Sequence, residues 1–445
     1  MTRQVAHIII EAETPLKVGS NASDFYQDSP VQKDWNGLPM ILGTSIAGVL
    51  RNAFDGDAKD IFGEENGSKV IFSNALLLNE KGKVCEKLLL EKDKTPFLKL
   101  FETLPIREHT RLDDKGVTGS SKEFSKFDEE VVYKGSRFKF SLELVEENSK
   151  VFGNILNIIN GGALRFGGGS TKGFGKCKII EIQTQTFDLK SYENYSSGLN
   201  HKLSKTITSE PIDSKSHIKY ILEIKPDDFF MFGSGFGDSD ADMTPVYEKV
   251  IDYGIVNNDE SKGGFLQKQI LLPASSIKGA LSHRTAYYYN LQNKHFIDNP
   301  DAKKAVTEIF GQAKDSKHEI NGAKGKILIS DCFRNKQEQT KTFDHVSIDR
   351  FTGGAISGAL FQEKTVAADA ETYAIEILLE KENKEDLTRE DTPYKKAVKA
   401  FECALKDICK GMLALGGATT KGHGVFCGDL KRGDDVIHKG ACDAK

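Results

Sequence analysis

The sequence predicts an α+β protein that consists of two tandem copies of one domain, with large loop insertions. Several short motifs occur twice, in the same order, along the 445 residues. The paired segments are 43–51 and 274–282, 61–63 and 309–311, 69–73 and 326–330, and 166–175 and 415–424. Because the order is kept while the intervening lengths differ, we interpret the pattern as a duplication with insertions.

Each copy is expected to open with a strand and a helix. Residues 6–13 and 217–224 are rich in strand-forming side chains. After a long polar loop, a helix is expected near Ser45 in the first copy and near Ser276 in the second. A hydroxyl at these positions can accept hydrogen bonds from the free N–H groups of the first helical turn.

The remaining elements follow from the spacing of apolar side chains. A period of two predicts half-buried strands at Phe138, Phe140, Leu142 and Leu144, and at Tyr373, Ile375, Ile377 and Leu379. Helical spacing follows at Val151, Phe152, Ile155 and Ile159, and at Val398, Phe401, Leu405, Ile408 and Met412. Each helix leads through a glycine-rich loop into a closing strand, 176–180 or 425–427. This order of elements is the plan of a ferredoxin-like domain.

The domain boundaries are placed by composition. We assign 1–190 to the first domain, 191–215 to a linker, 216–435 to the second domain and 436–445 to a tail. The linker lies in the stretch 186–215, which is polar and has no sustained period.

Composition excludes several classes of protein. The net charge of −4 argues against a generic DNA-coating protein. No apolar run reaches the ~18 residues that a membrane span needs, and the N-terminus has no signal-peptide pattern, so we expect no membrane partner and a cytoplasmic location. The seven cysteines include no Cys-x-x-Cys pair, which gives no support to a zinc knuckle.

One segment and two repeated motifs carry a family resemblance. Residues 345–363 read HVSIDRFTGGAISGALFQE, in which Ile-Asp-Arg-x-Thr-Gly-x-Ala is the most specific signal. With the Ser-Ser-Ile-Lys-Gly helix start and the Gly-Gly-x-x-Thr-Lys-Gly-x-Gly loops, it resembles the repeat-associated mysterious protein (RAMP) superfamily. The likeness is closest to the backbone subunit of type III CRISPR effector complexes. It covers both copies, as in a fusion of two such subunits.

The resemblance implies a fold, partners and an activity. It implies an RNA-recognition-type ferredoxin-like core that lies along a CRISPR guide RNA, beside other type III effector subunits. It also implies a hairpin thumb that splays the duplex of guide and target RNA, and a loop aspartate that promotes cleavage of the target RNA. Two alternatives stay open: an architectural subunit that cuts nothing, and a guide-processing endoribonuclease that uses histidine and no metal.

Two aspartates are the catalytic candidates. The family's aspartate precedes a Pro-Val pair, which matches Asp28 in the string 28–31. A loop carboxylate can hold a divalent cation such as Mg²⁺ or take a proton from the 2′-hydroxyl of RNA. Asp28 is therefore the expected catalytic residue and metal ligand. Asp242 is the second candidate, but it has one extra residue before Pro245, so the number of active copies stays open. With Asp238 and Asp240, it forms either a solvated loop tip or a metal site.

The glycine loops and helix starts are expected to hold RNA phosphates. Backbone N–H groups without side chains and a lysine suit an anion, as does a helix N-terminus; tight packing of the loops is the alternative. The loop candidates are Gly168, Gly169, Lys172 and Gly173, and Gly416, Gly417, Lys421 and Gly422. The helix-start candidates are Thr44, Ser45, Arg51, Ser275, Ser276 and Lys278. In the 345–363 segment the candidates are His345 and Arg350, which belong either to a thumb on RNA or to a structural network.

Overall fold

The computed structural model describes residues 2–20, 29–64, 66–110, 126–146, 148–207, 216–256, 266–296, 299–312, 321–334, 339–369, 371–381 and 392–440. Its internal contacts divide the chain into two compact units. Unit 1 comprises Met1–Ser170, Phe174–Ser214 and Lys249–Gln267, and unit 2 comprises Thr171–Gly173, Lys215–Glu248 and Lys268–Lys445. Residues 249–267 therefore group with unit 1, although they lie in the second half of the chain.

Unit 1 contains one antiparallel sheet covered by helices. β1 (Arg3–Ala12) lies between β7 (Arg137–Leu144) and β8 (Cys177–Phe187). β3 (Val70–Phe72) and β4 (Ala75–Leu77) pair with the other side of β7, and β2 (Met40–Ile41) and β9 (Lys205–Ile207) complete the edges. Helices α1 (Gly43–Ala53) and α4 (Ser149–Asn160) contribute Ile46, Leu50, Phe152 and Ile155 to its core.

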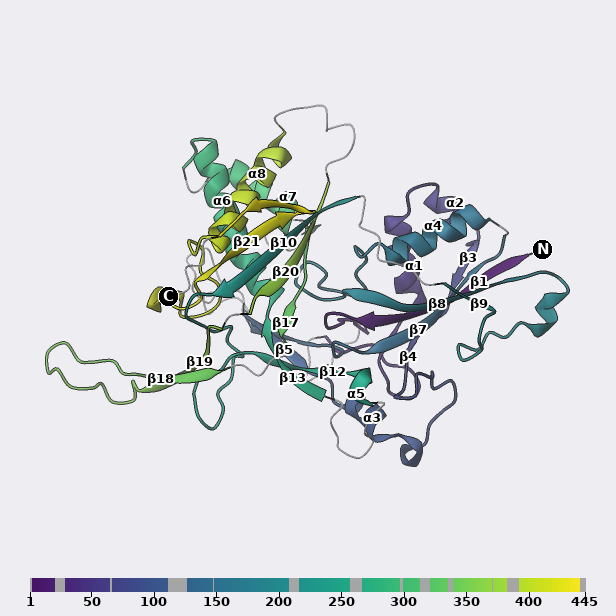
Figure 1. Cartoon of the computed structure of the whole chain (residues 1–445), viewed down its shortest axis with the longest axis horizontal. Coiled ribbons are helices and arrows are strands. Elements are labelled where there is room, and N and C mark those ends of the chain that lie inside the picture. The colour runs from purple at the N-terminus through teal and green to yellow at the C-terminus, as the bar shows by residue number, and fades with distance from the viewer. Residues whose placement is uncertain are drawn as a thin grey trace. The chain divides into compact units, whose positions relative to one another are not determined.

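Unit 2 repeats this plan. Its sheet has the order β16 (Ile327–Ile329), β20 (Tyr373–Glu380), β10 (His217–Pro226), β21 (Phe426–Arg432) and β22 (Asp435–His438). Helices α6 (Ala274–Gln292), α7 (Pro300–Phe310) and α8 (Pro393–Cys409) pack together and onto the sheet, as Figure 1 shows. The chain order strand, helix, two strands, helix, strand confirms two tandem ferredoxin-like domains.

The other elements are short. Unit 1 adds a hairpin of β5 (Ile106–Thr110) and β6 (Lys126–Glu130), and unit 2 adds a hairpin of β18 (Thr340–His345) and β19 (Phe361–Ala367). The rest are α2 (Ala58–Phe62), α3 (Pro96–Lys99), α5 (Tyr253–Val256), β11 (Phe229–Phe230), β12 (Tyr247–Ile251), β13 (Leu266–Leu272), β14 (Gly311–Gln312), β15 (Ala323–Lys324) and β17 (Cys332–Arg334). Among the described residues, no helix is long and apolar enough to cross a membrane.

The predicted hydroxyl caps of the first helix in each copy are wrong. Neither helix has a capping side chain on the residue before it. The first N–H of α1, at Gly43, donates instead to Asn74 Oδ1 at 2.9 Å, and that of α6, at Ala274, donates to Asp331 Oδ1 at 2.8 Å. Asn74 and Asp331 each follow the second strand motif of their copy. The caps are therefore side chains that follow strands of the sheet, whereas the sequence pattern placed them on hydroxyl residues at the helix start.

The structure differs from two smaller expectations. Part of the expected linker, 191–215, forms β9, which pairs with β8. Met412, predicted to lie on the buried face of α8, falls beyond the end of that helix, and its side chain is 61% exposed.

The buried His7 makes the stability of unit 1 depend on pH. It is 2% exposed in β1, and burial, followed by the charge of Lys139, lowers its pKa to about 4. At a pH between about 4, the pKa of His7 in the folded chain, and 6.5, its pKa in the unfolded chain, His7 binds a proton only in the unfolded chain. Stability should therefore fall by about 3 kcal/mol as the pH drops through this window. Urea unfolding at pH 7 and pH 4 should show a smaller loss in His7→Gln, whereas the exposed His283→Gln should match the wild type.

Candidate nucleic-acid interface

Both glycine loops bind the segment that follows the opening strand of their own copy. The N–H of Gly168 donates to Lys17 O at 2.7 Å, and the N–H of Gly417 donates to Met231 O, also at 2.7 Å. A Cβ added at Gly416 would lie 2.4 Å from Met231 O, at a φ of +90°. The packing interpretation therefore accounts for this half of each loop, since these two N–H groups are already used inside the protein.

The second half of the second loop is open. Ala418 and Gly422 adopt left-handed backbone conformations, with φ of 54° and 92°, on either side of a 3₁₀ turn at Thr419–Lys421. Residues 419–422 are exposed, and a Cβ at Gly422 would meet no atom of the described residues within 4 Å. This turn presents the backbone and the predicted RNA contacts Lys421 and Gly422 on the surface.

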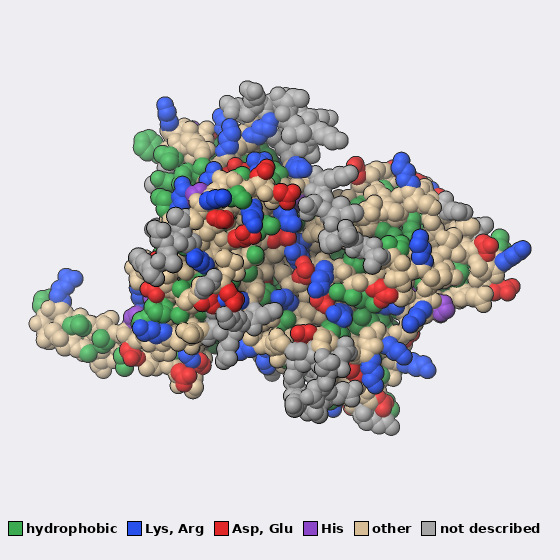
Figure 2. Space-filling view, in the orientation of Figure 1, with side chains coloured by type: hydrophobic (Ala, Val, Ile, Leu, Met, Phe, Trp, Pro, Cys, Tyr) green, Lys and Arg blue, Asp and Glu red, His purple; other side chains and the backbone are tan. Residues whose placement is uncertain are grey.

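The β18–β19 hairpin projects from unit 2 (Figure 1), and its connecting segment carries exposed apolar side chains. Between the two strands, Phe351 is 95% exposed, and Ile348 and Leu360 are exposed as well. Asp349 Oδ1 accepts from the N–H groups of Phe351 at 2.9 Å and Thr352 at 2.7 Å, which fixes the turn. These hydrogen bonds lower the pKa of Asp349. Figure 2 shows green and blue side chains along this projection, so the segment offers apolar and cationic groups together.

A buried carboxylate joins the hairpin to the second glycine loop. Glu363, on β19, is 1% exposed. Its Oε2 lies 3.4 Å from both His345 Nε2, on β18, and Lys421 Nζ, while its Oε1 lies 3.3 Å from His423 Nδ1. His345 also stacks on Phe361, with ring centroids 4.8 Å apart. We call Glu363, His345, His423 and Lys421 the Glu363 cluster. A buried carboxylate needs such compensation.

Unit 1 contains the same arrangement at the root of its own hairpin. Glu129, on β6, is 5% exposed, and its Oε2 lies 3.3 Å from His109 Nε2, on β5. Lys17 also forms an ion pair with Glu129. His109 stacks on Phe127 with a centroid separation of 5.0 Å. The two roots share a histidine that pairs with a phenylalanine across the hairpin, and a buried glutamate two positions after that phenylalanine.

The segments that follow the two candidate aspartates pair in the same way in the two repeats. Val31 and Pro245 each form an antiparallel bridge with a preceding glycine. Asp28 stands three positions before Val31, and Asp242 three positions before Pro245. The flanking hydrogen bonds agree: Ser20 N–H to Pro30 O with Ser234 N–H to Thr244 O, and Gln32 N–H to Val18 O with Val246 N–H to Phe232 O. The extra residue before Pro245 is therefore no insertion; the Pro-Val pair is shifted instead. Asp28 itself lies outside the described residues.

Asp242 is exposed beside the second hairpin. Its Oδ2 accepts from the N–H of Gln362 at 2.8 Å. The next residue, Met243, donates to Gln362 O at 3.0 Å and accepts from Lys364 N–H at 2.8 Å, so the segment runs along β19. Asp242 therefore lies next to the strand that carries Glu363.

The neighbouring acids do not gather into a metal cluster. Lys364 Nζ contacts Asp238 Oδ2 at 2.6 Å and Asp240 Oδ2 at 3.2 Å. The hydrogen bond from Lys364 lowers the pKa of Asp238. Within the part of the chain that the structure describes, no three His, Cys, Asp or Glu side chains are arranged to hold a metal ion. Asp238 and Asp240 are therefore surface acids that pair with a lysine.

Comparison with known families decides the relationship. A family scan matches the RAMP superfamily over residues 9–178 and 258–427, which together make up more than half of the chain. The chain belongs to the RAMP superfamily. The two matched ranges correspond to the two repeats of this RAMP protein. A search of curated proteins finds no match.

A search of solved structures finds a partial likeness to this RAMP chain. One match is a chain in the "Cryo-EM structure of the Type III-B Cmr-beta bound to cognate target RNA", with 18% sequence identity and a TM-score of 0.31. It covers 41% of the RAMP chain and 61% of the other chain, so the match takes in less than two thirds of that chain's length.

The other predicted contacts of the RAMP protein are distributed along its loops and helix starts. Thr44 and Ser276 are exposed in the first turns of α1 and α6, while Ser45 and Ser275 are half-buried. Arg51 NH2 lies 3.9 Å from Glu64 Oε1. Arg350 is exposed on the hairpin, and no ion pair of Arg350 is found among the described residues. The structural-network interpretation therefore fits His345 but not Arg350.

Lys278 and the residues near it are more enclosed. Its Nζ donates to Thr171 Oγ1 at 3.0 Å, and both residues belong to unit 2. Burial, and then the charge of Lys172, lowers the pKa of Lys278 to about 8. Added Cβ atoms at Gly169 and Gly173 would lie 2.5 Å from the Phe174 ring and 2.1 Å from Asp331 Oδ1. Close packing thus also explains these two glycines.

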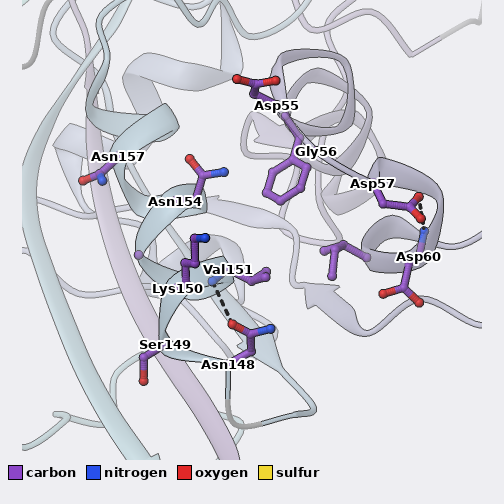
Figure 3. Close-up of a pocket in the computed structure, with 13 residues that line it drawn as sticks. Asp55, Gly56, Asp57, Asp60, Asn148, Ser149, Lys150, Val151, Asn154 and Asn157 are labelled. Atoms are coloured by element: carbon purple, nitrogen blue, oxygen red, sulfur yellow. Dashed lines mark hydrogen bonds between the residues drawn. The ribbon is translucent and has the colours of Figure 1, made fainter.

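A cavity of about 750 Å³ in unit 1 is separate from all of these residues. It lies between α2 and α4 and is lined by acidic and amide side chains (Figure 3). Asp57 caps α2 and Asn148 caps α4 through their side-chain oxygens. An acidic lining disfavours a phosphate, and none of the predicted RNA contacts lines this cavity.

Proposed function

We propose that this RAMP protein is a guide-RNA-binding backbone subunit of a type III CRISPR ribonucleoprotein, with target RNA and other effector subunits as partners. The observation that carries the proposal is the Glu363 cluster, because it joins an exposed apolar hairpin to an open loop that bears a lysine. Phosphate contacts position a nucleic acid, and exposed aromatic side chains stack on its bases. The two elements together offer both kinds of contact.

We further propose that the complex cleaves target RNA and that Asp242 and Asp28 are the catalytic residues. RNA carries its own nucleophile in the 2′-hydroxyl. Asp242 is exposed, with one carboxylate oxygen held by Gln362 N–H, which fixes its orientation beside the hairpin. A single carboxylate fits a Mg²⁺ ion whose other ligands are water and the RNA phosphate. When bound, such a cation would supply compensation for charge that develops on the phosphate. The carboxylate of Asp242 can hold that cation or accept the proton of the 2′-hydroxyl.

The hairpin gives this proposal a test that does not depend on cleavage. Phe351→Ala should weaken binding of a target RNA by about tenfold, because it removes one stacking side chain. A 2-aminopurine base at successive positions of the target should regain fluorescence at one position in this variant. Phe296→Ala is the matched control, since Phe296 is 93% exposed in the same unit but lies after α6. Equal behaviour of the two variants would argue against RNA contact by the hairpin.

A further inference from the structure

Lys421 stands between a buried acid and the solvent. Its Nζ lies 3.4 Å from Glu363 Oε2 and 4.9 Å from the centre of the Phe361 ring, yet its side chain is 44% exposed. It therefore contacts the Glu363 carboxylate on one side and remains open to a ligand on the other.

The other members of the Glu363 cluster do not replace this lysine. His345 Nε2 and His423 Nδ1 approach the carboxylate at 3.4 and 3.3 Å. Both atoms, like Glu363 Oε1, are buried and have no partner with hydrogen-bond geometry among the residues that the structure describes. A histidine is charged only when protonated, whereas lysine carries its charge at neutral pH. Because an uncompensated buried carboxylate is strongly destabilising, Lys421 is held to Glu363.

We propose that Glu363 competes with RNA phosphate for Lys421, and so acts as a positioning residue that limits the affinity of this loop for RNA. The inference rests on the proposed RNA binding of the second glycine loop. A phosphate that contacts Lys421 comes close to the Glu363 carboxylate, and like charges near a low-dielectric interior repel with little screening. Loss of Glu363 also frees the lysine side chain. The freed lysine must be ordered again when it contacts the phosphate, which opposes binding. This entropy cost involves one flexible side chain, so removal of the repelling charge has the larger effect.

The first repeat supports this interpretation. Glu129 occupies the position of Glu363 and also contacts a lysine, but the lysine is Lys17, from the segment after β1. The two repeats thus keep a buried acid in contact with a lysine while drawing that lysine from different segments.

A double-mutant cycle on the full chain tests the competition. The probe is a fluorescein-labelled oligouridine, followed by anisotropy at fixed salt. Glu363→Gln should bind it about fivefold more tightly, and Lys421→Met about fivefold more weakly. The double variant should bind like Lys421→Met, because the gain acts through the lysine. Glu223→Gln removes the same charge at the Glu223–Lys431 pair elsewhere in unit 2 and should not change binding.

Several outcomes would overturn the proposal. If Glu363→Gln binds more tightly in the Lys421→Met background as well, the effect comes from net charge and not from competition. If Glu363→Gln weakens binding, the carboxylate assists RNA. Should Glu363→Gln fail to fold, Glu363→Asp draws the charge back by one methylene and should still bind more tightly than wild type; equal or weaker binding counts against the idea. No binding by the wild-type chain would reject the proposed function itself.

Discussion

Asparagine at Asp28 and Asp242 should remove target-RNA cuts one set at a time in a reconstituted complex. Each change removes a charged carboxylate oxygen at the position three residues before Val31 or Pro245, which form equivalent backbone bridges. Loss of general base or metal-ligand function lowers rates by about 10² to 10⁴-fold. Denaturing gels of end-labelled target should therefore lose one product series in each single variant and both in the double variant, while guide binding stays unchanged.

The same loop provides a control for this experiment. Asp240 lies two positions before Asp242 but contacts Lys364 Nζ, so Asp240→Asn should cut at the wild-type rate. Unchanged cutting by the double variant Asp28→Asn, Asp242→Asn would reject the catalytic assignment. It would leave the architectural alternative, in which the subunit binds guide RNA without cutting.

Chelation separates the remaining alternative. Cleavage that depends on a carboxylate and Mg²⁺ should stop when EDTA is added and return with excess Mg²⁺. Processing of guide RNA by a histidine general acid and base should continue in EDTA. A chelator-resistant product that disappears in His345→Ala would favour the processing endoribonuclease.

The fold could be predicted because its signals are local and occur twice. The alternation at Phe138 and Phe140, and the helical spacing at Phe401 and Leu405, each depend on residues within one element. All four side chains are buried in the structure. The helix caps could not be predicted in the same way, because Asp331 reaches Ala274 only when the sheet brings them together.

The Glu363 cluster depends on a register that no local pattern contains. In the hairpin His345 pairs with Phe361, and Phe343 pairs with Glu363, so the histidine and the acid come together across two strands. The connections of the two hairpins differ in length, so the sequence does not show that the two histidine–glutamate pairs are equivalent. The Pro-Val pair suggested an insertion that the backbone does not have. The pair lies one residue farther from Asp242 than from Asp28 in the sequence, but Pro245 forms the same kind of bridge as Val31.

The two halves of one glycine motif also separate only in three dimensions. Whether the N–H of Gly417 is free depends on Met231, which is far away in the sequence and accepts its hydrogen bond. Gly422 belongs to the same string of residues, yet no atom in the described part of the chain lies within 4 Å of the position its Cβ would take. A shared motif therefore predicted one role for residues that have different surroundings.

Substitutions at Gly416 and Gly422 should consequently affect different properties. Gly416→Ala places a Cβ 2.4 Å from Met231 O at a φ of +90°, so we expect it to lower the free energy of unfolding by about 3 kcal/mol. Gly422→Ala has the same backbone strain without the collision and should cost about 1 kcal/mol. Because residue 422 is exposed beside Lys421, its methyl group should weaken oligouridine binding through steric exclusion of the phosphate.

Chemical denaturation and anisotropy, measured on both variants, check this separation. Gly416→Ala should unfold at lower urea and, while folded, bind RNA like the wild type. Gly422→Ala should unfold closer to the wild-type urea concentration and should bind RNA more weakly. If Gly416→Ala proves as stable as the wild type, or if Gly422→Ala binds RNA normally, the division of the loop into a packing half and an RNA-facing half is wrong. The repeated motif would then need one role along its whole length, as the sequence first suggested.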